Sequence, residues 1–332
     1  MGIRYLNRYL RDNCTESIKC IKMSEISYKK IAVDISIYLY KYESENTLLE
    51  NMFVMLSIFR YYNIIPIFIF DGKPPPEKKA LLQKRKEDKE TAQKEYNELK
   101  RQLTILQESK DNNNLNQCEK QEIIATMDQL KKQFVQINKD KIENVKSLIR
   151  AYGATYYDAP GEADELCALL VIKNKVWACL SEDMDLFVYG CTRVLRYFSI
   201  ISHTVVLYNT EGIYNELKMT HKEFKEICVL SGTDYNINTD DNIKNVNLKQ
   251  TIEHFNKFKE TNKSKDTNFY DWLILNTNYV SDIRLLNKIN NMFNLEYNYE
   301  KLELFKNIKI VNGHIRQDEI KNIMKNEDFI FL

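Results

Sequence analysis

Five short apolar runs alternate with longer amphipathic stretches over the first two thirds of the chain. The runs occupy residues 31–33, 64–70, 154–157, 176–180 and 204–208. Unbroken apolar runs of this length are typical of strands that are covered on both faces, and helical patterns lie between them. The pattern therefore predicts an α/β fold in which helices flank a mostly parallel central sheet.

Acidic residues follow directly after the first four runs. Asp34 and Asp71 follow the first two runs, an acidic stretch at 158–165 follows the third, and another at 182–185 follows the fourth. In open parallel sheets, sites form beyond the carboxyl ends of the strands, where loops converge. We therefore expect these carboxylates to meet at one edge of the sheet and to form a concentrated acidic pocket.

The candidates for this pocket are seven carboxylates: Asp34, Asp71, Glu162, Asp164, Asp183, Asp185 and Asp234. A cluster of like charges needs a cation to neutralise it, and all-oxygen ligands favour Mg²⁺ or Mn²⁺ over zinc. Two such ions about 3.5–4 Å apart can activate a water molecule and stabilise the leaving oxygen of a phosphodiester. Taken singly, however, an acid after a strand is more often a helix N-cap or a turn residue.

The spacing of the paired acids limits their geometry. Asp183 and Asp185 are two residues apart, so an extended backbone would point both side chains the same way. Glu162 and Asp164 precede a helical pattern, and on a regular helix two such residues lie roughly 200° from each other. Either a helix begins between Glu162 and Asp164, or one of them acts through bound water.

Residues 77–150 have a different pattern, with two apolar stripes at helical spacing. The stripes consist of Tyr96, Leu99, Leu103 and Leu106, and of Met127, Leu130, Phe134 and Ile137. The polar stretch at 111–117 separates them and has little to bury, so the pattern predicts a helical hairpin with a flexible tip. An alternative interpretation is a coiled-coil protrusion that has no role in catalysis.

Composition narrows the class of protein. The 332 residues are 44% apolar, which suffices for a core in one large domain or two small ones. The seven cysteines form no Cys-x-x-Cys pair and the four histidines stand far apart, which argues against a zinc site. No apolar run approaches the roughly 20 residues that span a bilayer, and a secretory signal is lacking, so we expect a soluble intracellular protein. The net charge of +1 neither favours nor excludes nucleic acid.

Six short motifs follow one another along the chain. They are Met1-Gly2-Ile3, Val33-Asp34, Phe70-Asp71-Gly72-Lys73-Pro74-Pro75, Ala159-Pro160-Gly161-Glu162-Ala163-Asp164, Glu182-Asp183-Met184-Asp185 and Leu230-Ser231-Gly232-Thr233-Asp234-Tyr235. Their order and spacing resemble the nuclease motifs of the flap endonucleases, which are structure-specific 5′ nucleases of the XPG/RAD2 type. The resemblance implies a PIN-like 5′-nuclease fold with an N-terminal nuclease region (1–76), a helical arch (77–150), an internal nuclease region (151–235) and a helical DNA-binding and C-terminal region (236–332).

The resemblance also implies an activity. It points to a 5′ flap endonuclease that hydrolyses a DNA phosphodiester near the junction of single-stranded and double-stranded DNA, in replication or repair. The implied cofactors are two Mg²⁺ ions, for which Mn²⁺ substitutes, and the implied partner of the monomeric protein is branched or flap DNA. A mainly 5′→3′ exonuclease is one alternative. A non-catalytic scaffold for branched DNA is another, although a scaffold is expected to lose several of the carboxylates and all seven positions are acidic here.

By the resemblance, all seven carboxylates would bind metal, and Lys78 and Arg85 would be the catalytic cations at the base of the arch. Seven residues are close to two helical turns, so both cations would project from one face, about 10 Å apart along the axis. There they could offset charge that develops on the scissile phosphate. The alternative is a solvated basic helix face, since Lys79, Lys84 and Lys86 lie nearby.

Contacts with DNA would come from four further residues. Tyr40 corresponds to the aromatic residue that stacks on the base beside the scissile phosphate, and its alternative is a ring buried in an Ile/Leu/Tyr-rich helix. Gly2 belongs to the N-terminal motif. Lys244 and Lys249 follow the last aspartate and would contact phosphates without reading the sequence of the DNA.

Several positions depart from the family pattern. Asp164 stands where flap endonucleases usually carry Glu and the related exonucleases carry Asp, whereas Gly72-Lys73-Pro74-Pro75 favours the flap endonuclease branch. Asn245 and Asn247 replace glycines of the hairpin that grips duplex phosphates. Asn tolerates left-handed backbone, so the turn can persist, but the replacement does not favour the potassium ion usually bound there.

Two further departures concern partners. The segment 40–51 is shorter than in cellular flap endonucleases, so a strict preference for a one-nucleotide 3′ flap is not expected. The C-terminus has no clear sliding-clamp motif, because Gln317 and Ile320 begin the pattern but Ile323 and Met324 stand where paired aromatic residues belong. These departures fit a divergent or viral member that acts in the nucleus or at a cytoplasmic replication site.

Overall fold

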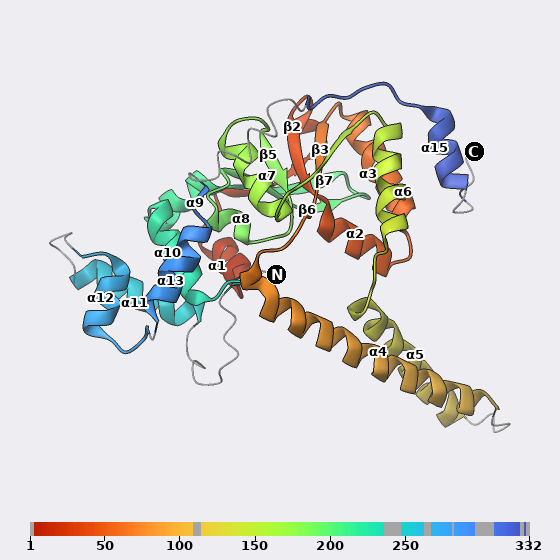
Figure 1. The fold of residues 1–332 in the computed structure, drawn as a ribbon, viewed down its shortest axis with the longest axis horizontal. Coiled ribbons are helices and arrows are strands. Elements are labelled where there is room, and N and C mark those ends of the chain that lie inside the picture. The colour runs from red at the N-terminus through yellow and green to blue at the C-terminus, as the bar shows by residue number, and fades with distance from the viewer. Residues whose placement is uncertain are drawn as a thin grey trace.

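The computed structural model describes residues 3–108, 114–235, 247–261, 267–280, 282–295, 309–325 and 329, and of residues 106–108 and 114–122 it describes the backbone alone. A seven-stranded sheet lies at the centre of this part of the chain (Figure 1). Its strands are β1 (Ile18–Lys22), β2 (Lys30–Asp34), β3 (Ile65–Phe70), β4 (Thr155–Asp158), β5 (Ala178–Leu180), β6 (Arg193–Ser199) and β7 (Thr204–Asn209). Their order across the sheet is β1-β7-β6-β5-β2-β3-β4.

The pairing of the strands confirms a mostly parallel sheet. Strand β2 runs parallel to β3 and β5, β3 to β4, and β5 to β6, whereas β7 runs antiparallel to β6 and β1. The five predicted strands are all present. The two that the pattern missed, β1 and β6, carry lysine or arginine between their apolar residues and therefore contain no unbroken apolar run.

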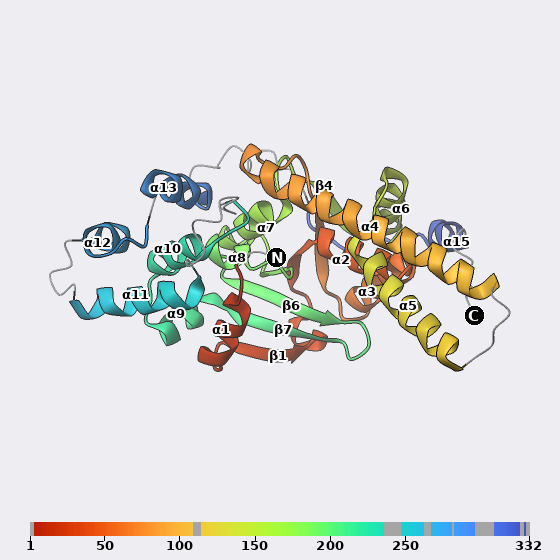
Figure 2. The same ribbon diagram turned by 90° about the horizontal axis from the view of Figure 1, so that it is seen from below.

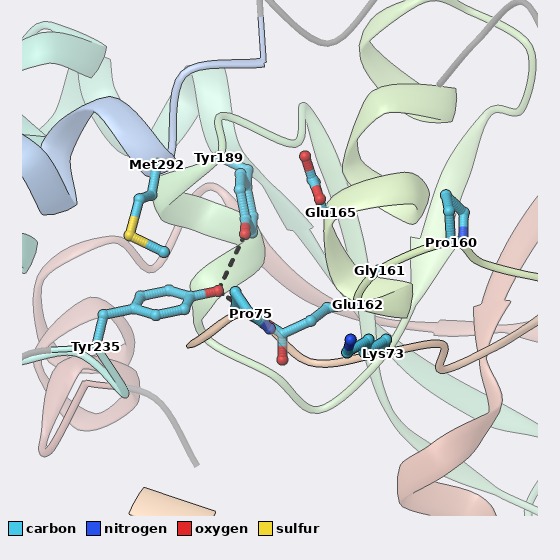
Figure 3. Close-up of a pocket in the computed structure, with 9 residues that line it drawn as sticks. All are labelled: Lys73, Pro75, Pro160, Gly161, Glu162, Glu165, Tyr189, Tyr235 and Met292. Atoms are coloured by element: carbon cyan, nitrogen blue, oxygen red, sulfur yellow. Dashed lines mark hydrogen bonds between the residues drawn. The ribbon is translucent and has the colours of Figure 1, made fainter. Parts of the chain in front are cut away.

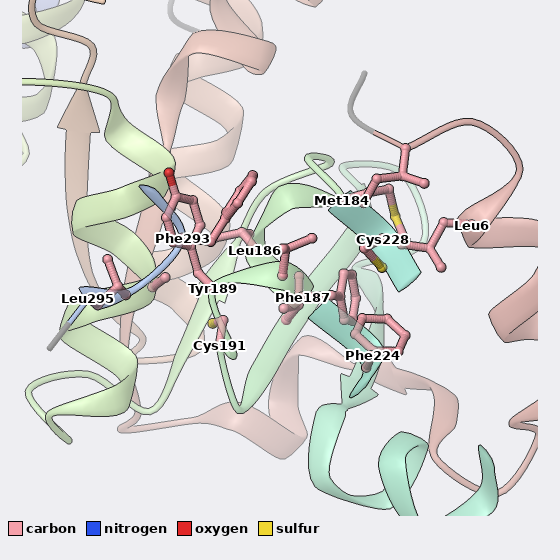
Figure 4. Close-up of a cluster of buried hydrophobic side chains, with 14 of the residues drawn as sticks. Leu6, Met184, Leu186, Phe187, Tyr189, Cys191, Phe224, Cys228, Phe293 and Leu295 are labelled. Atoms are coloured by element: carbon pink, nitrogen blue, oxygen red, sulfur yellow. The ribbon is translucent and has the colours of Figure 1, made fainter. Parts of the chain in front are cut away.

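Helices cover both faces of the sheet, because successive residues of a strand point to opposite sides. In β2, Ala32 belongs to one apolar cluster while Ile31 and Val33 belong to another. The first cluster, part of which is drawn in Figure 4, includes residues of α1 (Leu6–Asn13), α7 (Ala163–Ile172), α8 (Asp185–Val188) and α10 (His221–Ser231). The second includes residues of α2 (Ile35–Ser44), α3 (Leu48–Tyr61), α6 (Lys139–Ala151) and α15 (Gln317–Lys325).

Four further helices lie on the side of the sheet away from α15, as Figures 1 and 2 both show. They are α9 (Thr210–Leu217), α11 (Leu248–Thr261), α12 (Phe269–Asn276) and α13 (Ile283–Met292). Helices α11, α12 and α13 contact α10, and Phe255, Phe269 and Leu273 join them to the first apolar cluster. This group therefore extends the core beside α10 and forms no separate body.

Helices α4 (Lys79–Glu108) and α5 (Asn114–Gln133) form the predicted helical hairpin, which projects away from the sheet (Figures 1 and 2). The rings of Tyr96 and Phe134 meet edge to face with centroids 5.3 Å apart, and Leu130 is buried. Part of the expected tip is helical, since α5 begins at residue 114; residues 111–113 lie outside the described residues. Phe134 and Ile137, which were expected to continue the second stripe, lie beyond the end of α5.

The C-terminal segment crosses back to α3 and α6 (Figure 1). Gly313 donates its backbone N–H to the Gly153 carbonyl at 2.7 Å. Gly153 has φ +71°, and a Cβ there would lie 2.6 Å from the Gly313 carbonyl, so this crossing requires glycine. Ile320 and Met324 of α15 are buried in the second apolar cluster. Of the four residues at which a clamp motif was considered, Ile320 and Met324 are therefore part of the core, whereas Gln317 is exposed.

Among the helices within the described ranges, none is both long and apolar enough to span a bilayer.

Candidate active site

Loops at the carboxyl ends of the strands bring the predicted carboxylates to one cavity of about 750 Å³. Six of the seven line it: Asp34, Asp71, Glu162, Asp164, Asp183 and Asp234. The seventh, Asp185, is completely buried and begins α8. The acidic pocket that the sequence predicts at this edge of the sheet is therefore present.

Asp34 is buried at the carboxyl end of β2, where it caps α2. It accepts the Ser36 backbone N–H at 3.3 Å and the Ser181 hydroxyl at 2.8 Å. Burial and then the neighbouring charge of Asp71 raise the pKa of Asp34 to about 7, although both hydrogen bonds favour the charged form. A cation in the cavity would stabilise the ionised form of this carboxylate.

Asp71 connects the end of β3 to the start of α7. One carboxylate oxygen accepts the Ala163 backbone N–H at 2.8 Å, and the other accepts the Ser36 hydroxyl. Because α7 begins at Ala163, Glu162 precedes the helix and Asp164 lies in its first turn. Of the two arrangements expected for this pair, a helix that begins between them is confirmed.

Glu162 and Asp164 differ in their surroundings. Glu162 Oε1 lies 2.5 Å from Lys78 Nζ, and Oε2 accepts the Tyr235 hydroxyl at 2.6 Å. Asp164 is buried, and burial followed by the charges of Asp183 and Glu162 raises its pKa well above the ordinary range. The ionised form of Asp164 is therefore disfavoured unless further positive charge lies close to it.

The expectation of an extended backbone between Asp183 and Asp185 is wrong. Met184 has helical dihedral angles (φ −80°, ψ −14°), and Asp183 accepts the Asp185 backbone N–H at 3.0 Å as α8 begins. A short acidic side chain readily caps the amide two residues on, and here that turn wins over extension. Burial and then the charge of Asp183 raise the pKa of Asp185 well above its ordinary value.

Lys78 and Arg85 face these carboxylates from the base of the hairpin. Lys78 ends the 3-10 turn η2 (Pro76–Lys78), and its Nζ lies 3.8 Å from Asp234 Oδ2. Arg85 of α4 donates to the same oxygen at 2.9 Å. Burial alone would lower the pKa of Lys78, but Asp164 and Glu162 outweigh it and raise that pKa above its ordinary value. Both cations reach one cavity, as predicted, although Lys78 precedes α4.

The donor set fits a hard divalent cation. Lys78 and Arg85 pair with two of the seven acidic side chains at this edge, Glu162 and Asp234. Within the described residues, neither carboxylate oxygen of the buried Asp185 has a hydrogen-bond partner, so this side chain calls for further positive charge. Carboxylate oxygens are the ligands that favour Mg²⁺ or Mn²⁺.

Two of the carboxylates at this edge pair with cations of the protein itself. In the ranges that the structure describes, no three His, Cys, Asp or Glu side chains are arranged so that they could hold a metal ion. Lys78 and Arg85 engage oxygens of Glu162 and Asp234 instead.

Tyr235 supports Glu162 from a second cavity of about 330 Å³, which Figure 3 shows. Its hydroxyl donates to Glu162 and lies 3.4 Å from the Tyr189 hydroxyl, while Lys78 Nζ lies 5.0 Å from its ring centroid. Phe293 packs edge to face against the same ring, with centroids 5.3 Å apart. Sequence reasoning gave Tyr235 no role, and its place directly after Asp234 was the available signal.

Tyr40 lies on α2 and lines the larger cavity with 47% of its surface exposed. The alternative of a buried ring is therefore wrong, and stacking on a base stays a prediction. Lys89 of α4 lies over this ring, with Nζ 5.1 Å from the centroid. Lys86, Lys89 and Lys132 all line the cavity, and of these only Lys86 was noted from the sequence.

The remaining DNA contacts stay predictions. Lys249 is exposed in the first turn of α11 and lines neither cavity. Gly2 and Lys244 lie outside the described residues, as does Asn245 of the turn where a potassium ion was considered.

Two stretches of the chain match known families. Residues 1–92 match the XPG N-terminal domain, and residues 153–234 match the XPG I-region, which together cover just over half of the chain. The chain belongs to the XPG/RAD2 nuclease family. All seven predicted carboxylates, Lys78 and Arg85 lie within the two XPG regions, whereas most of the hairpin lies between them.

Relatives in the XPG/RAD2 family align with most of the chain. A probable RAD2-like endonuclease of Invertebrate iridescent virus 6 is 27% identical over 317 residues, covering 80% of this chain and 76% of that protein. Flap endonuclease 1 of Zea mays is 31% identical over 254 residues, covering 71% of this chain and 62% of that protein.

A solved structure supports the predicted XPG/RAD2 fold. The catalytic core of Rad2 in complex with DNA substrate matches with a TM-score of 0.59 over 98% of this chain and 94% of that one. The two sequences are 20% identical, so this match concerns the fold alone. The predicted 5′-nuclease fold is confirmed.

Proposed function

We propose that this chain is a structure-specific 5′ flap endonuclease that hydrolyses a DNA phosphodiester near the junction of single-stranded and double-stranded DNA, in replication or repair. The observation that carries the proposal is one cavity in which six acidic side chains face Lys78 and Arg85 at the base of a helical hairpin. Relatives named as RAD2-like and flap endonucleases, and a neighbour of the same fold bound to DNA, support this activity and partner.

The residues that would hold two Mg²⁺ ions, or Mn²⁺ in their place, are Asp34, Asp71, Glu162, Asp164, Asp183, Asp185 and Asp234. Bound metal would supply an activated water and neutralise charge on the leaving oxygen. Ser181 orients Asp34, and Ser36 together with the Ala163 N–H orients Asp71. Such outer contacts fix the direction of carboxylate oxygens before a ligand arrives.

Lys78 and Arg85 would exchange partners during the reaction. Lys78 pairs with Glu162 and Arg85 pairs with Asp234. Once those carboxylates bind metal, the ammonium and the guanidinium can donate to the scissile phosphate, whose charge grows in the transition state. Tyr40, exposed on the cavity wall, would stack on an unpaired base beside that phosphate.

A mainly 5′→3′ exonuclease is the second candidate, and Asp164 is the residue that favours it. The two relatives named above are endonucleases, which favours the first candidate. The products separate the two, because an exonuclease releases mononucleotides and a flap endonuclease releases the flap in one piece.

The test is cleavage of a 5′-labelled flap DNA in Mg²⁺ by the wild type, Asp183→Ala and Asp158→Ala, with EDTA as a further control. Asp158 also ends a strand, but it is paired with Lys146 at 2.8 Å and does not line the cavity. We expect one long product from the wild type and from Asp158→Ala, and none from Asp183→Ala or in EDTA. Binding of the flap without any cleavage in Mg²⁺ or Mn²⁺ would overturn the proposal in favour of a scaffold.

A further inference from the structure

Arg196 is a buried arginine beside the loop that carries two of the candidate metal ligands. It lies on β6 and is 5% exposed. One terminal nitrogen donates to the Glu182 carbonyl at 2.9 Å, and Nε lies 3.4 Å from the Glu182 carboxylate. The other terminal nitrogen lies 2.9 Å from the Met184 sulfur. The guanidinium therefore holds the residues immediately before and after Asp183.

These contacts with Glu182 and Met184 require an arginine. The guanidinium is planar and presents five donors in a fixed fork, whereas a lysine presents one point charge on a flexible stem. A buried cation is also costly unless it is paired, and Glu182 is its ion-pair partner. The guanidinium of Arg196 is thus a fixed positive charge next to the Asp183 loop. It lies outside the cavity, because Arg196 is not among the residues that line it.

The same guanidinium reaches the N-terminal helix. It donates to the Asn7 side-chain oxygen of α1 at 2.6 Å, and the Tyr208 hydroxyl donates to that oxygen at 2.8 Å. Asn7 in turn donates its amide to the Tyr197 hydroxyl at 2.8 Å. Helix α1 and strands β6 and β7 are thereby joined through Asn7.

A bulge in β6 closes this network. The register with β7 shifts between Arg196 and Ser199, and Tyr197 adopts φ 56°, a region that non-glycine residues rarely occupy. In that conformation the Tyr197 backbone N–H donates to the Glu182 carboxylate. Backbone strain of this kind persists where surrounding contacts fix it. Glu182 is consequently fixed by its carbonyl and by its side chain.

We propose that Arg196 is a positioning residue for the metal site: it fixes residues 182–184, so that Asp183 and Asp185 are held ready to share a cation, and it ties that loop to α1. The inference rests on the proposed function, because it assumes that Asp183 and Asp185 bind metal. Arg196 touches neither substrate nor metal in this role and acts only through the loop.

The test compares Arg196→Lys and Asn7→Ala with a matched control on the same strand, Arg193→Met. Arg193 lies over the Trp177 ring, 5.5 Å from its centroid, and is outside the network. Mn²⁺ binding to each full-length protein without DNA is followed by electron paramagnetic resonance, and melting temperature and cleavage kinetics on flap DNA are measured alongside. Asp183→Asn reports whether the Mn²⁺ signal comes from the proposed site.

We expect Arg196→Lys to raise the half-saturating Mn²⁺ concentration at least tenfold and to lower kcat, with less than a twofold change in KM for DNA. Asn7→Ala, which keeps the guanidinium and loses only its tie to α1, should raise that concentration two- to fivefold. Arg193→Met should match the wild type in Mn²⁺ binding. Wild-type Mn²⁺ affinity in a folded Arg196→Lys overturns the inference, and so does wild-type affinity in Asn7→Ala if Arg196→Lys does not fold. Equal Mn²⁺ binding by the wild type and Asp183→Asn would instead remove the proposed metal site, and this inference with it.

Discussion

The carboxylate edge of the sheet and the helical hairpin are built in opposite ways. At the edge, Asp34, Asp164 and Asp185 are almost fully buried, so packing holds acidic groups close together although burial raises their pKa values. The hairpin places most of α4 in solvent and buries few side chains along its length. The tightly packed edge therefore holds the candidate catalytic groups in fixed positions. The hairpin has little internal packing, so we expect it to contribute mainly through its contacts with a ligand.

Asp185→Asn should have the largest effect and should separate activity from stability. Cleavage in Mg²⁺ should fall by about 10³-fold or more, because a metal ligand is lost. The metal-free variant should melt at a higher temperature than the wild type, because burial and Asp183 disfavour the charged form of Asp185 in the folded state. Calorimetry of both proteins in EDTA checks the effect on stability. A lower melting temperature for the variant would show that the Asp185 carboxylate does not destabilise the folded state.

Lys78→Met and Arg85→Met should come next, with kcat lower by about 10²–10³-fold, the usual range for loss of a group that stabilises transition-state charge. KM for flap DNA should change little. Lys84→Met is the matched control, since Lys84 is exposed on α4, the helix of Arg85, and does not line the cavity. Single-turnover cleavage measures each variant, and a control that loses as much activity would mean that α4 contributes only general positive charge.

Leu130→Ser should weaken the hairpin and leave the edge intact. Leu130 is buried on α5, and its neighbour Lys131 is exposed, so Lys131→Ser is the control. We expect KM for flap DNA to rise about fivefold, which corresponds to about 1 kcal/mol of lost contacts, with kcat nearly unchanged. The comparison between the two regions fails if kcat drops as far as it does in Lys78→Met.

Glu226→Gln should have the smallest effect on activity and tests burial of a carboxylate away from the site. Burial raises the pKa of Glu226 on α10 to about 7, with Lys222 opposing. The folded protein therefore binds this proton more tightly than the unfolded chain, so wild-type stability falls as pH rises from about 4.5 to about 7. Gln mimics the neutral form, and the variant should gain about 1–3 kcal/mol at pH 8 and nothing at pH 4. Urea unfolding at both pH values measures the gain, and wild-type cleavage should be retained.

Much of the fold could be predicted because it depends on local pattern. The runs that became β2, β3, β4, β5 and β7 are apolar without interruption, while Lys19 in β1 and Arg196 in β6 break the pattern. The ends of those strands also showed where the carboxylates would gather, since parallel strands share one carboxyl edge.

The contacts that refine the site could not be predicted, because they join residues distant in sequence. Ser181 orients Asp34, Tyr235 supports Glu162, and no periodicity links either pair. The predicted geometry of Asp183 and Asp185 was wrong for a different reason. A capping turn and an extended strand are both compatible with the same short sequence, and only the start of α8 decides between them.

The length of helix α4 has one further consequence: a movement of the helix becomes smaller toward its base. The helix has 30 residues and Arg85 is the seventh, so its length is about 45 Å and Arg85 lies about 10 Å from its start. If the helix swings about its base, a sideways displacement of about 4 Å at the far end moves Arg85 by about 1 Å. The far end of the hairpin can therefore move to fit DNA strands of different shape. Lys78 precedes the pivot and keeps its position beside the carboxylates.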